Sequence, residues 1–269
     1  MLNKFVIYFS LPAMILLQIP KLNISQDSLI PIVVAWSTII LCAILVLIFS
    51  KIFNFSKEIT GALLLVAPLG NTSFLGIPIV QSYYGDLALP YVIIYDQVGS
   101  FLALATYGTF VVAYYSNKTK VNLSIILKKL FTFPPFIFLL LAFALVGIEY
   151  EPLVADILKV LSSTIVPFAV LAVGMQLKLM LPKDDLKPFS TALLIKLIIS
   201  PILAVIVCKL FSFSGDIASI SIMEAGMGPM ITAGAMASIA GMAPRLVSSI
   251  LGYGIIVSFM TTYILYVSF

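Results

Sequence analysis

The chain has 269 residues, of which 62% are hydrophobic and 10% are charged. A soluble protein of this length does not bury that much apolar surface, so the composition excludes a soluble fold and predicts a protein that crosses a membrane several times. The net charge of +4 does not indicate nucleic-acid binding, because the lysines lie mainly in loops between apolar segments; the absence of histidine removes the most common metal ligand.

Hydropathy predicts nine membrane-spanning segments joined by short loops, and therefore an all-α polytopic membrane protein. In chain order the segments are Phe5–Ile19, Leu29–Phe49, Ile59–Tyr84, Leu87–Tyr115, Phe133–Gly147, Leu153–Gln176, Pro188–Leu210, Ile217–Ala240 and Arg245–Val267. We interpret the first segment as a span and not as a cleaved signal peptide, because Pro12 lies inside it and no small-residue cleavage site follows.

The basic residues of the loops predict how the spans are oriented. If the nine spans alternate in direction, Lys21 and Lys209 lie on one side and a much larger basic group lies on the other. The larger group comprises Lys4, Lys51, Lys57, Lys118, Lys120, Lys128, Lys129, Lys178, Lys183, Lys187 and Arg245. Cytoplasmic loops carry an excess of lysine and arginine. We therefore expect a multi-pass protein of the plasma (inner) membrane with a cytoplasmic N-terminus and an external C-terminus.

The third and eighth segments are each interrupted near the middle. Residues 59–84 contain the run Gly70-Asn71-Thr72-Ser73-Phe74-Leu75-Gly76-Ile77-Pro78, and residues 217–240 contain Gly226-Met227-Gly228-Pro229. Glycine and proline interrupt a helix, and inside a membrane the peptide groups freed by the break must be satisfied by protein or by a water-filled cavity. Two such breaks at matching places in two halves of a chain are typical of a transporter's binding site.

Four pairs of prolines recur at a nearly constant separation, which indicates an internal repeat. The pairs are Pro12 with Pro167, Pro31 with Pro188, Pro78 with Pro229 and Pro90 with Pro244, separated by 151 to 157 residues. This separation maps the first four spans onto the last four with opposite orientation, as in the inverted repeats of many secondary transporters. The span at Phe133–Gly147 has no partner, so we infer a five-plus-five inverted repeat whose first helix is missing from this chain.

The run from Gly70 to Pro78 resembles the G-N-x-x-F-x-G-x-P signature of the auxin efflux carrier family, whose bacterial members are small ten-helix permeases. Further likeness lies in Tyr95-Asp96-Gln97, in Pro167 through Gly174-Met175, and in Met223-Glu224-Ala225-Gly226-Met227-Gly228-Pro229. The likeness runs from about Phe5 to the C-terminus. One departure is Met-Gly-Pro at the second break, where the family more often has Ala-Met-Pro or Ala-Leu-Pro.

The resemblance implies a fold similar to that of bile-acid sodium symporters, in which a scaffold supports a moving transport domain. Mapped onto this chain, residues 1–28 and 116–187 would form the scaffold (panel) helices, and residues 29–115 and 188–269 the transport (core) domain. The broken helices at 59–84 and 217–240 would cross at the substrate site. The family also dimerises through its scaffold, which implies a homodimer.

The two breaks carry the expected substrate contacts. The resemblance implies that Asn71 contacts the substrate, and the neighbouring positions extend this set. The expected substrate-binding residues are Asn71, Thr72, Ser73, Gly76, Pro78, Gly228, Pro229, Met230 and Thr232. The N-terminus of a half-helix carries partial positive charge and free N–H groups, which suit a carboxylate. The alternative interpretation is that Asn71 only caps the helix after the break.

Four polar residues inside the spans, Asp96, Gln97, Lys196 and Glu224, are expected to couple transport to an ion. A carboxyl group at such depth is unfavourable unless it is paired, and it marks a functional site by default. Our hypothesis is that Lys196 neutralises one carboxylate while the other exchanges a proton. The alternative is a static salt bridge that joins helices. No cofactor is expected apart from coupled H⁺ or Na⁺.

These features predict a secondary transporter (permease) that moves a small organic anion, such as a carboxylate, across the bilayer. The alternatives are a sodium-coupled organic-anion symporter of the bile-acid type, a passive channel and a non-transporting remnant. An intramembrane enzyme is disfavoured. Tyr95-Asp96 is similar to the first motif of membrane aspartyl proteases, but the second Gly-x-Gly-Asp motif is absent, as are metal ligands and a Ser–His arrangement.

Overall fold

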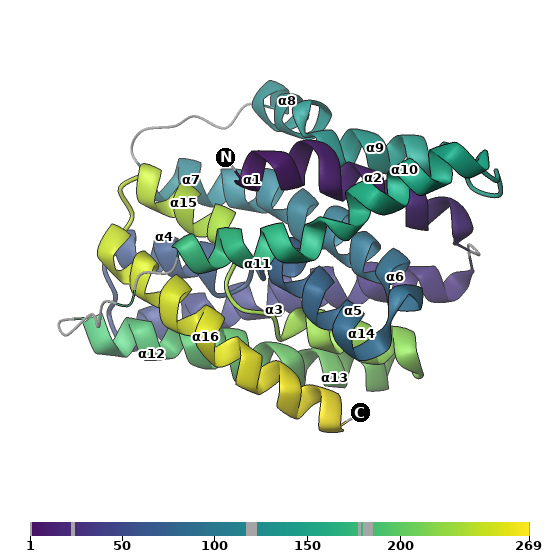
Figure 1. The fold of residues 1–269 in the computed structure, drawn as a ribbon. Helices are drawn as coiled ribbons and strands as arrows, with labels where there is room; N and C mark the ends of the chain where they lie inside the picture. Colours follow the sequence, from purple (N-terminus) through teal and green to yellow (C-terminus); the bar gives the residue numbers. More distant parts are fainter. Residues whose placement is uncertain (1, 23–24, 117–122, 177–178, 180–184, 269) are drawn as a thin grey trace.

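The computed structural model describes residues 2–22, 25–116, 123–176, 179 and 185–268 (Figure 1). The elements in these ranges are helices, which agrees with the predicted all-α fold. Six of these helical stretches are long and apolar enough to cross a membrane, as expected of a polytopic membrane protein. Lys118, Lys120, Lys178 and Lys183, which contribute to the predicted orientation, lie outside the described residues.

The six long stretches coincide with six of the predicted spans, and several are built from shorter helical pieces. Leu2–Lys21 comprises α1 (Leu2–Phe5), η1 (Val6–Ser10), α2 (Leu11–Gln18) and η2 (Ile19–Lys21). Gln26–Ile52 comprises η3 (Gln26–Leu29) and α3 (Ile30–Ile52). Asp86–Tyr115 comprises η5 (Asp86–Ala88), α6 (Leu89–Ile94), η6 (Tyr95–Phe101), η7 (Leu104–Gly108) and α7 (Thr109–Tyr115). Pro152–Gln176 comprises α10 (Pro152–Ser163) and α11 (Ile165–Gln176). Leu186–Leu210 comprises α12 (Leu186–Leu194), η9 (Ile195–Ile199) and α13 (Ser200–Leu210). The sixth stretch is the single helix α16 (Pro244–Ser268).

The other three predicted spans take different forms. The fifth is the short helix α9 (Pro134–Ala144), which follows α8 (Leu123–Thr132). The third is divided into α4 (Lys57–Val66), the π-helical turn η4 (Thr72–Gly76) and α5 (Ile77–Tyr84). The eighth is divided into α14 (Asp216–Ala225) and α15 (Ile231–Ile239). The two interruptions therefore lie where the glycines and prolines predict them.

Many prolines of the apolar segments stand in the first turn of a helix. Pro31 stands in the first turn of α3, Pro135 in that of α9 and Pro152 in that of α10. The first turn has no intrahelical acceptor for its N–H groups, so the N–H that proline lacks is not missed there. These prolines thus mark where helices start, whereas the interruptions at residues 70–78 and 226–229 also contain glycine.

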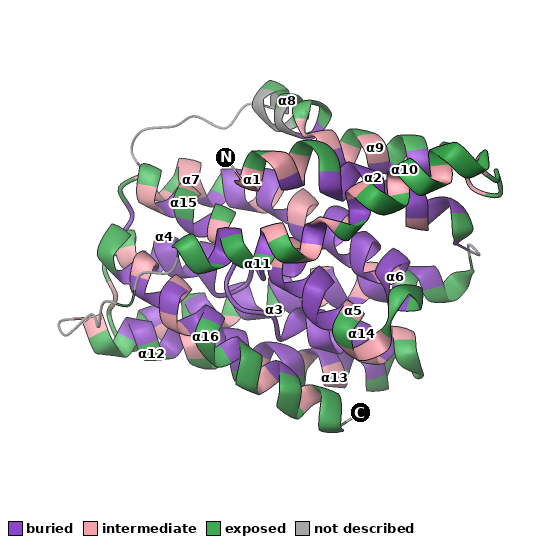
Figure 2. Cartoon of the chain, in the orientation of Figure 1, coloured by how far each residue is buried: buried purple, intermediate pink, exposed green. Residues whose placement is uncertain are grey.

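The helices group along two edges of the molecule in Figure 1. Along one edge, α2 packs against α9 and α10, with α1 and α8 beside them. Along the opposite edge lie α12, α13 and α16, and α3 packs against both α13 and α14. The broken segments lie between these groups. Figure 2 shows that buried residues fill the middle and exposed residues follow the outer faces.

The two broken segments meet. Gly70 and Pro229 form an antiparallel bridge in which the Asn71 N–H donates to the Gly228 carbonyl at 2.7 Å and the Met230 N–H donates to the Leu69 carbonyl at 3.0 Å. Each break therefore satisfies peptide groups of the other, which removes the free-energy penalty of leaving them unpaired in an apolar interior. This confirms the predicted crossing of the two breaks.

The crossing lies deep in the packed interior. Leu63, Leu65 and Leu69 are fully buried before the first break, and Ile77 is fully buried after it. A helix that is apolar on every face is stable only when it is surrounded, and α4 meets this condition by packing against α3, α7, α15 and α16. The surrounding helices therefore hold the crossing at the centre of the protein.

Helix α16 passes the crossing at a glycine. A Cβ atom added at Gly254 would lie 2.7 Å from Cγ and Cδ of Pro229. We expect Gly254→Ala to lower the free energy of unfolding by about 1–3 kcal/mol, because an extra methyl group in a closely packed core forces its neighbours apart. The change is measured by thermal unfolding of the purified protein in detergent.

The matched control is Gly174→Ala in α11, where an added Cβ atom would meet nothing within 4 Å. This variant should be as stable as the wild type or more stable by about 0.5–1 kcal/mol, since alanine is favoured over glycine inside a helix. Equal stability of the two variants would contradict the close approach of α16 to Pro229.

Candidate functional site

The C-terminal ends of the two half-helices before the breaks are capped by side chains. The Ala225 carbonyl at the end of α14 accepts from Lys196 Nζ at 3.0 Å and from Ser200 Oγ at 2.8 Å. The Leu64 carbonyl in the last turn of α4 accepts from the Tyr107 hydroxyl at 2.7 Å. The last carbonyls of a helix have no intrahelical donor and carry partial negative charge, so these donors stabilise both ends.

The N-terminal end after the first break is capped by Asn71. Its Oδ1 accepts from the Phe74 N–H at 3.3 Å, and its carbonyl accepts from the N–H groups of Leu75 and Gly76. Its Nδ2 is buried and has no hydrogen-bond partner. The alternative interpretation of Asn71 as a cap is thus correct for its oxygen, while its amino group is left unpaired.

A carboxylate and three donors lie beside this cap. Asp96 on η6 is 2% exposed and accepts from Thr72 Oγ1 at 2.5 Å, from Ser73 Oγ at 2.6 Å and from Gln97 Nε2 at 2.6 Å. Gln97 Oε1 has no partner. The π-helical turns η4 and η6 supply all four side chains, and such turns occur often at functional sites because they rotate side chains out of the regular helical register.

These groups line a cavity of about 100 Å³. The predicted site residues that line it are Asn71, Thr72, Ser73, Asp96, Gln97, Met230 and Thr232. Among the described lining residues, Asp96 is the one that carries a formal charge when ionised. Both half-helices that follow the breaks begin at this cavity.

The remaining lining residues are apolar. They are Ile7, Leu11, Phe74, Phe101, Leu104 and Phe133. Phe101 and Phe133 stack with ring centroids 4.0 Å apart, which joins the start of α9 to η6. Phe74 belongs to the signature run at the first break, but no sequence signal distinguishes the other five, because each is one apolar side chain inside an apolar segment. Only packing brings them to the cavity.

Four predicted substrate contacts do not line the cavity. Gly228 and Pro229 form the crossing and pack against α16, where a Cβ atom added at Gly228 would lie 3.1 Å from the Cα of Ile255. Pro78 is buried in the first turn of α5. Gly76 closes η4 on its other side, against Glu224. These residues shape the backbone around the cavity rather than its wall.

Lys196 and Glu224 also lie outside the cavity. Lys196 is 2% exposed and Glu224 is fully buried, yet neither Glu224 oxygen has a hydrogen-bond partner and the ammonium group donates to Ala225. Among the described residues, therefore, the predicted neutralisation of a carboxylate by direct contact with Lys196 is not seen. Lys196 instead donates a hydrogen bond to the Ala225 carbonyl at the end of α14.

Other cavities surround the small one. A space of about 350 Å³ shares Ile7, Phe101, Leu104, Phe133 and Thr232 with it and extends past Tyr8, Thr132 and Met236. A separate space of about 370 Å³, lined partly by Lys21, Asp86, Asp156 and Lys159, shares no lining residue with it. The space past Tyr8, Thr132 and Met236 therefore continues the small cavity, and the space beside Lys21 does not.

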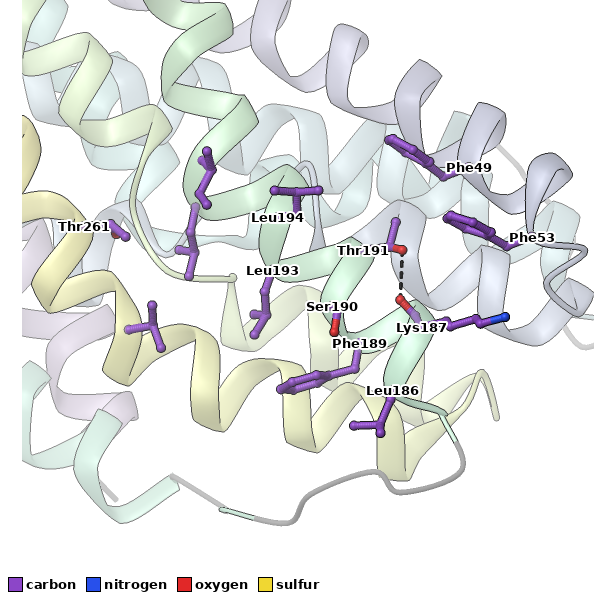
Figure 3. A pocket seen from close by; sticks show the side chains of 13 residues that line it. Phe49, Phe53, Leu186, Lys187, Phe189, Ser190, Thr191, Leu193, Leu194 and Thr261 are labelled. Carbon is purple, nitrogen blue, oxygen red and sulfur yellow. Dashed lines mark hydrogen bonds between the residues drawn. The ribbon is translucent and has the colours of Figure 1, made fainter.

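A larger hollow of about 710 Å³ is an apolar groove between the end of α3, helix α12 and α16 (Figure 3). Phe49, Phe53, Phe189 and Leu194 form much of its wall, and Lys187 lies at one end. It contains none of the predicted site residues. An apolar groove on the outer face of a membrane protein is where lipid tails pack, so its size alone does not identify the functional site.

Comparison with known proteins gives a consistent result. A family model described as Membrane transport protein matches residues 1–266. The chain is 30% identical to an uncharacterized transporter of Methanocaldococcus jannaschii over 236 residues, and this matched region covers 84% of this chain and 75% of that protein. It is 26% identical to an uncharacterized transporter of Methanothermobacter thermautotrophicus over 265 residues, and this matched region covers 97% of this chain and 85% of that protein.

The hydrogen bonds to Asp96 lead to a stability prediction. Asp96→Ala should lower the free energy of unfolding by about 3 kcal/mol, because it leaves the buried donors of Thr72 and Gln97 and the half-buried donor of Ser73 unpaired, and each buried unpaired group costs about 1–3 kcal/mol. Asp96→Asn keeps one acceptor oxygen and should lose less. The measurement is thermal or denaturant unfolding in detergent.

The control for this prediction is Asp156→Ala on the outer face of α10, which should leave stability nearly unchanged. If Asp96→Ala were as stable as Asp156→Ala, the three hydrogen bonds to Asp96 would not exist in the purified protein.

Proposed function

The chain belongs to the membrane transport protein family, the family of the auxin efflux carriers that its sequence resembles, and on that premise we propose that it is a secondary transporter of a small organic anion. The observation that carries this proposal is the cavity at the crossing, where both half-helices begin and the Asn71 amino group has no partner. Half-helix N-termini at a mid-membrane crossing suit a carboxylate, because they offer N–H groups and partial positive charge.

The size of the cavity supports a small ligand. A volume of about 100 Å³ is a few times the roughly 30 Å³ that one water molecule occupies in the liquid. A carboxylate of two to four carbons is of that order. A larger solute would extend into the adjoining space of about 350 Å³, past the Phe101–Phe133 stack.

The charge inside the cavity supports coupling to a cation. Asp96 lies in its wall, and among the described lining residues no lysine or arginine balances an added anion. Two negative charges in a space of low dielectric repel each other strongly. An anion therefore binds favourably only when a proton or a sodium ion enters with it, which is a symport mechanism; the sodium-coupled alternative differs only in which cation enters.

We also propose that this conformation faces the cytoplasm. The space that continues the cavity extends past Tyr8, Thr132 and Met236, toward the ends of the helices that border the lysine-rich loops. The cavity beside Lys21 and Asp86 lies toward the opposite ends and is separate from it. With a cytoplasmic N-terminus, the open side is the inner one.

The binding role of Asn71 can be separated from its capping role. Serine is a good N-cap residue but lacks the amino group, so Asn71→Ser should fold normally and bind the anion about 10–100-fold more weakly, the effect of losing one hydrogen bond to a charged group. Asn71→Asp also keeps the cap and should abolish binding by repulsion. The measurement is uptake of radiolabelled malonate, malate and succinate into proteoliposomes, with thermal unfolding as the check on folding.

The matched control is Asn3→Ser on α1, outside the cavity, which should transport as the wild type does. Uptake of none of these carboxylates above empty liposomes would contradict the proposed substrate class. Wild-type uptake by Asn71→Ser would remove Asn71 from the site.

The direction of access can be tested with cysteine labelling. Both natural cysteines, Cys42 and Cys208, are buried, so the background is low. Thr232→Cys should react with a membrane-impermeant thiol reagent added from the cytoplasmic side of oriented membrane vesicles and not from the external side. Lys57→Cys and Ser214→Cys, at exposed positions at the two ends, serve as the cytoplasmic and external controls. Labelling of Thr232→Cys from the external side alone would contradict the inward-facing assignment.

A further inference from the structure

Glu224 is a buried carboxyl group with no donor. It lies in the last turn of α14, immediately before the second break, and it is 0% exposed. Neither Oε1 nor Oε2 has a hydrogen-bond partner. An ionised carboxylate in such a place is strongly unfavourable unless donors or a cation surround it. Asp96 presents the opposite case, because three donors surround it and stabilise its ionised form.

The carboxyl group of Glu224 lies directly against the backbone of η4. A Cβ atom added at Gly76 would lie 2.5 Å from each Glu224 oxygen and 2.8 Å from Cδ, so only glycine fits at this position. At the other end of the same turn, Thr72 and Ser73 donate to Asp96. The five residues of η4 are thus held between two carboxyl groups, one at the cavity and one away from it.

The titratable groups near Glu224 come from several elements. Lys196 on η9 and Asp96 and Tyr95 on η6 interact electrostatically with it, and Cys42 on α3 lies near Lys196 and Tyr95. At the far end of α14, Asp216 and Tyr266 on α16 both interact electrostatically with Tyr84 on α5. Asp216 lies about two helical turns from Glu224 along α14, since eight residues of helix rise about 12 Å. Cys208 on α13, the other thiol on a helix packed against α14, is also buried. The nearest cation is therefore Lys196, which is already bound to the Ala225 carbonyl.

We propose that Glu224 is the proton-carrying group of this transporter, protonated in the conformation described and deprotonated at another stage of the cycle. The proton leaves a Glu224 oxygen for water and returns from water, and no bond between heavy atoms changes. Once ionised, Glu224 attracts the Lys196 ammonium away from the Ala225 carbonyl. That transfer weakens the cap at the second break and pulls on η4, which also carries the donors of the substrate cavity.

This inference rests on the proposed function, because the proton drives transport only if the protein is a transporter. The protonation of Glu224 itself can be tested without a transport assay. Exposed carboxyl groups are ionised at neutral pH, so the infrared difference spectrum of wild type minus Glu224→Gln at that pH should contain the C=O band of a protonated carboxyl group. The difference spectrum of wild type minus Glu58→Gln, a matched control at the exposed start of α4, should lack this band. Absence of the band from the wild type minus Glu224→Gln spectrum would overturn the assignment, whatever the protein transports.

The transport arm uses proteoliposomes with malonate, malate or succinate, whichever the wild type takes up. Glutamine imitates a permanently protonated side chain, so Glu224→Gln should lose accumulation driven by an imposed pH gradient by tenfold or more. Exchange of labelled for unlabelled substrate, which needs no net proton movement, should persist. Accumulation by Glu224→Gln equal to that of Glu58→Gln would overturn the proposal.

A sodium arm separates the two cations. In the proposed mechanism, replacing Na⁺ by K⁺ leaves both the thermal stability and the accumulation of the wild type unchanged. If Na⁺ raised the melting temperature of the wild type and not of Glu224→Gln, the site would bind sodium and the proton assignment would be wrong. Absence of uptake with an intact infrared result would instead contradict the proposed substrates and leave the proton site standing.

Discussion

The structure depends on how two interrupted helices satisfy their peptide groups inside a membrane. A lipid environment offers no water to an exposed N–H or carbonyl, so a break is stable only where the protein supplies partners. Here each break supplies partners to the other through the Gly70–Pro229 bridge. Side chains cap three of the four helix ends at the breaks: Asn71 caps one N-terminal end, and Lys196 with Ser200 and Tyr107 cap the two C-terminal ends.

A few buried polar groups around the two breaks have no hydrogen-bond partner, and the proposed binding and coupling roles depend on them. The Asn71 amino group and Gln97 Oε1 are buried and unpaired in two residues that line the cavity at the crossing, and Glu224 remains without a donor on the other side of η4. A soluble protein would hydrate such groups or pair them. In the proposed mechanism, a ligand and a proton complete these groups at different stages of the transport cycle. Binding and coupling are then two uses of the same incomplete pairing.

The short turn η4 connects these uses. Its first two residues hold the Asp96 carboxylate at the cavity, and its last residue, Gly76, touches the Glu224 carboxyl group. In the proposed mechanism, a change of charge at Glu224 acts on the same backbone that positions Thr72 and Ser73. The effect would then travel over one helical turn, and no longer pathway through the protein is needed.

Much of the fold and of the candidate site could be predicted from the sequence, because the relevant signals are local. Glycine and proline inside apolar segments located both breaks, and their depth in the membrane singled out the polar residues Asn71, Asp96, Lys196 and Glu224. Hydropathy alone could not show that six long helices are accompanied by the short helix α9 and two divided segments, because a break changes backbone geometry without changing composition.

The tertiary structure decided which of the polar residues act together. Nothing in the sequence distinguishes Ile7, Phe101 or Phe133 from other apolar side chains, yet packing brings them to the cavity wall. Nor could spacing show that Lys196 binds the Ala225 carbonyl instead of a carboxylate, or that Gly76 lies against Glu224 and not against a solute. Residue type determines what a side chain can do, whereas its partner depends on which helices pack side by side, and that is settled only when the whole chain is folded.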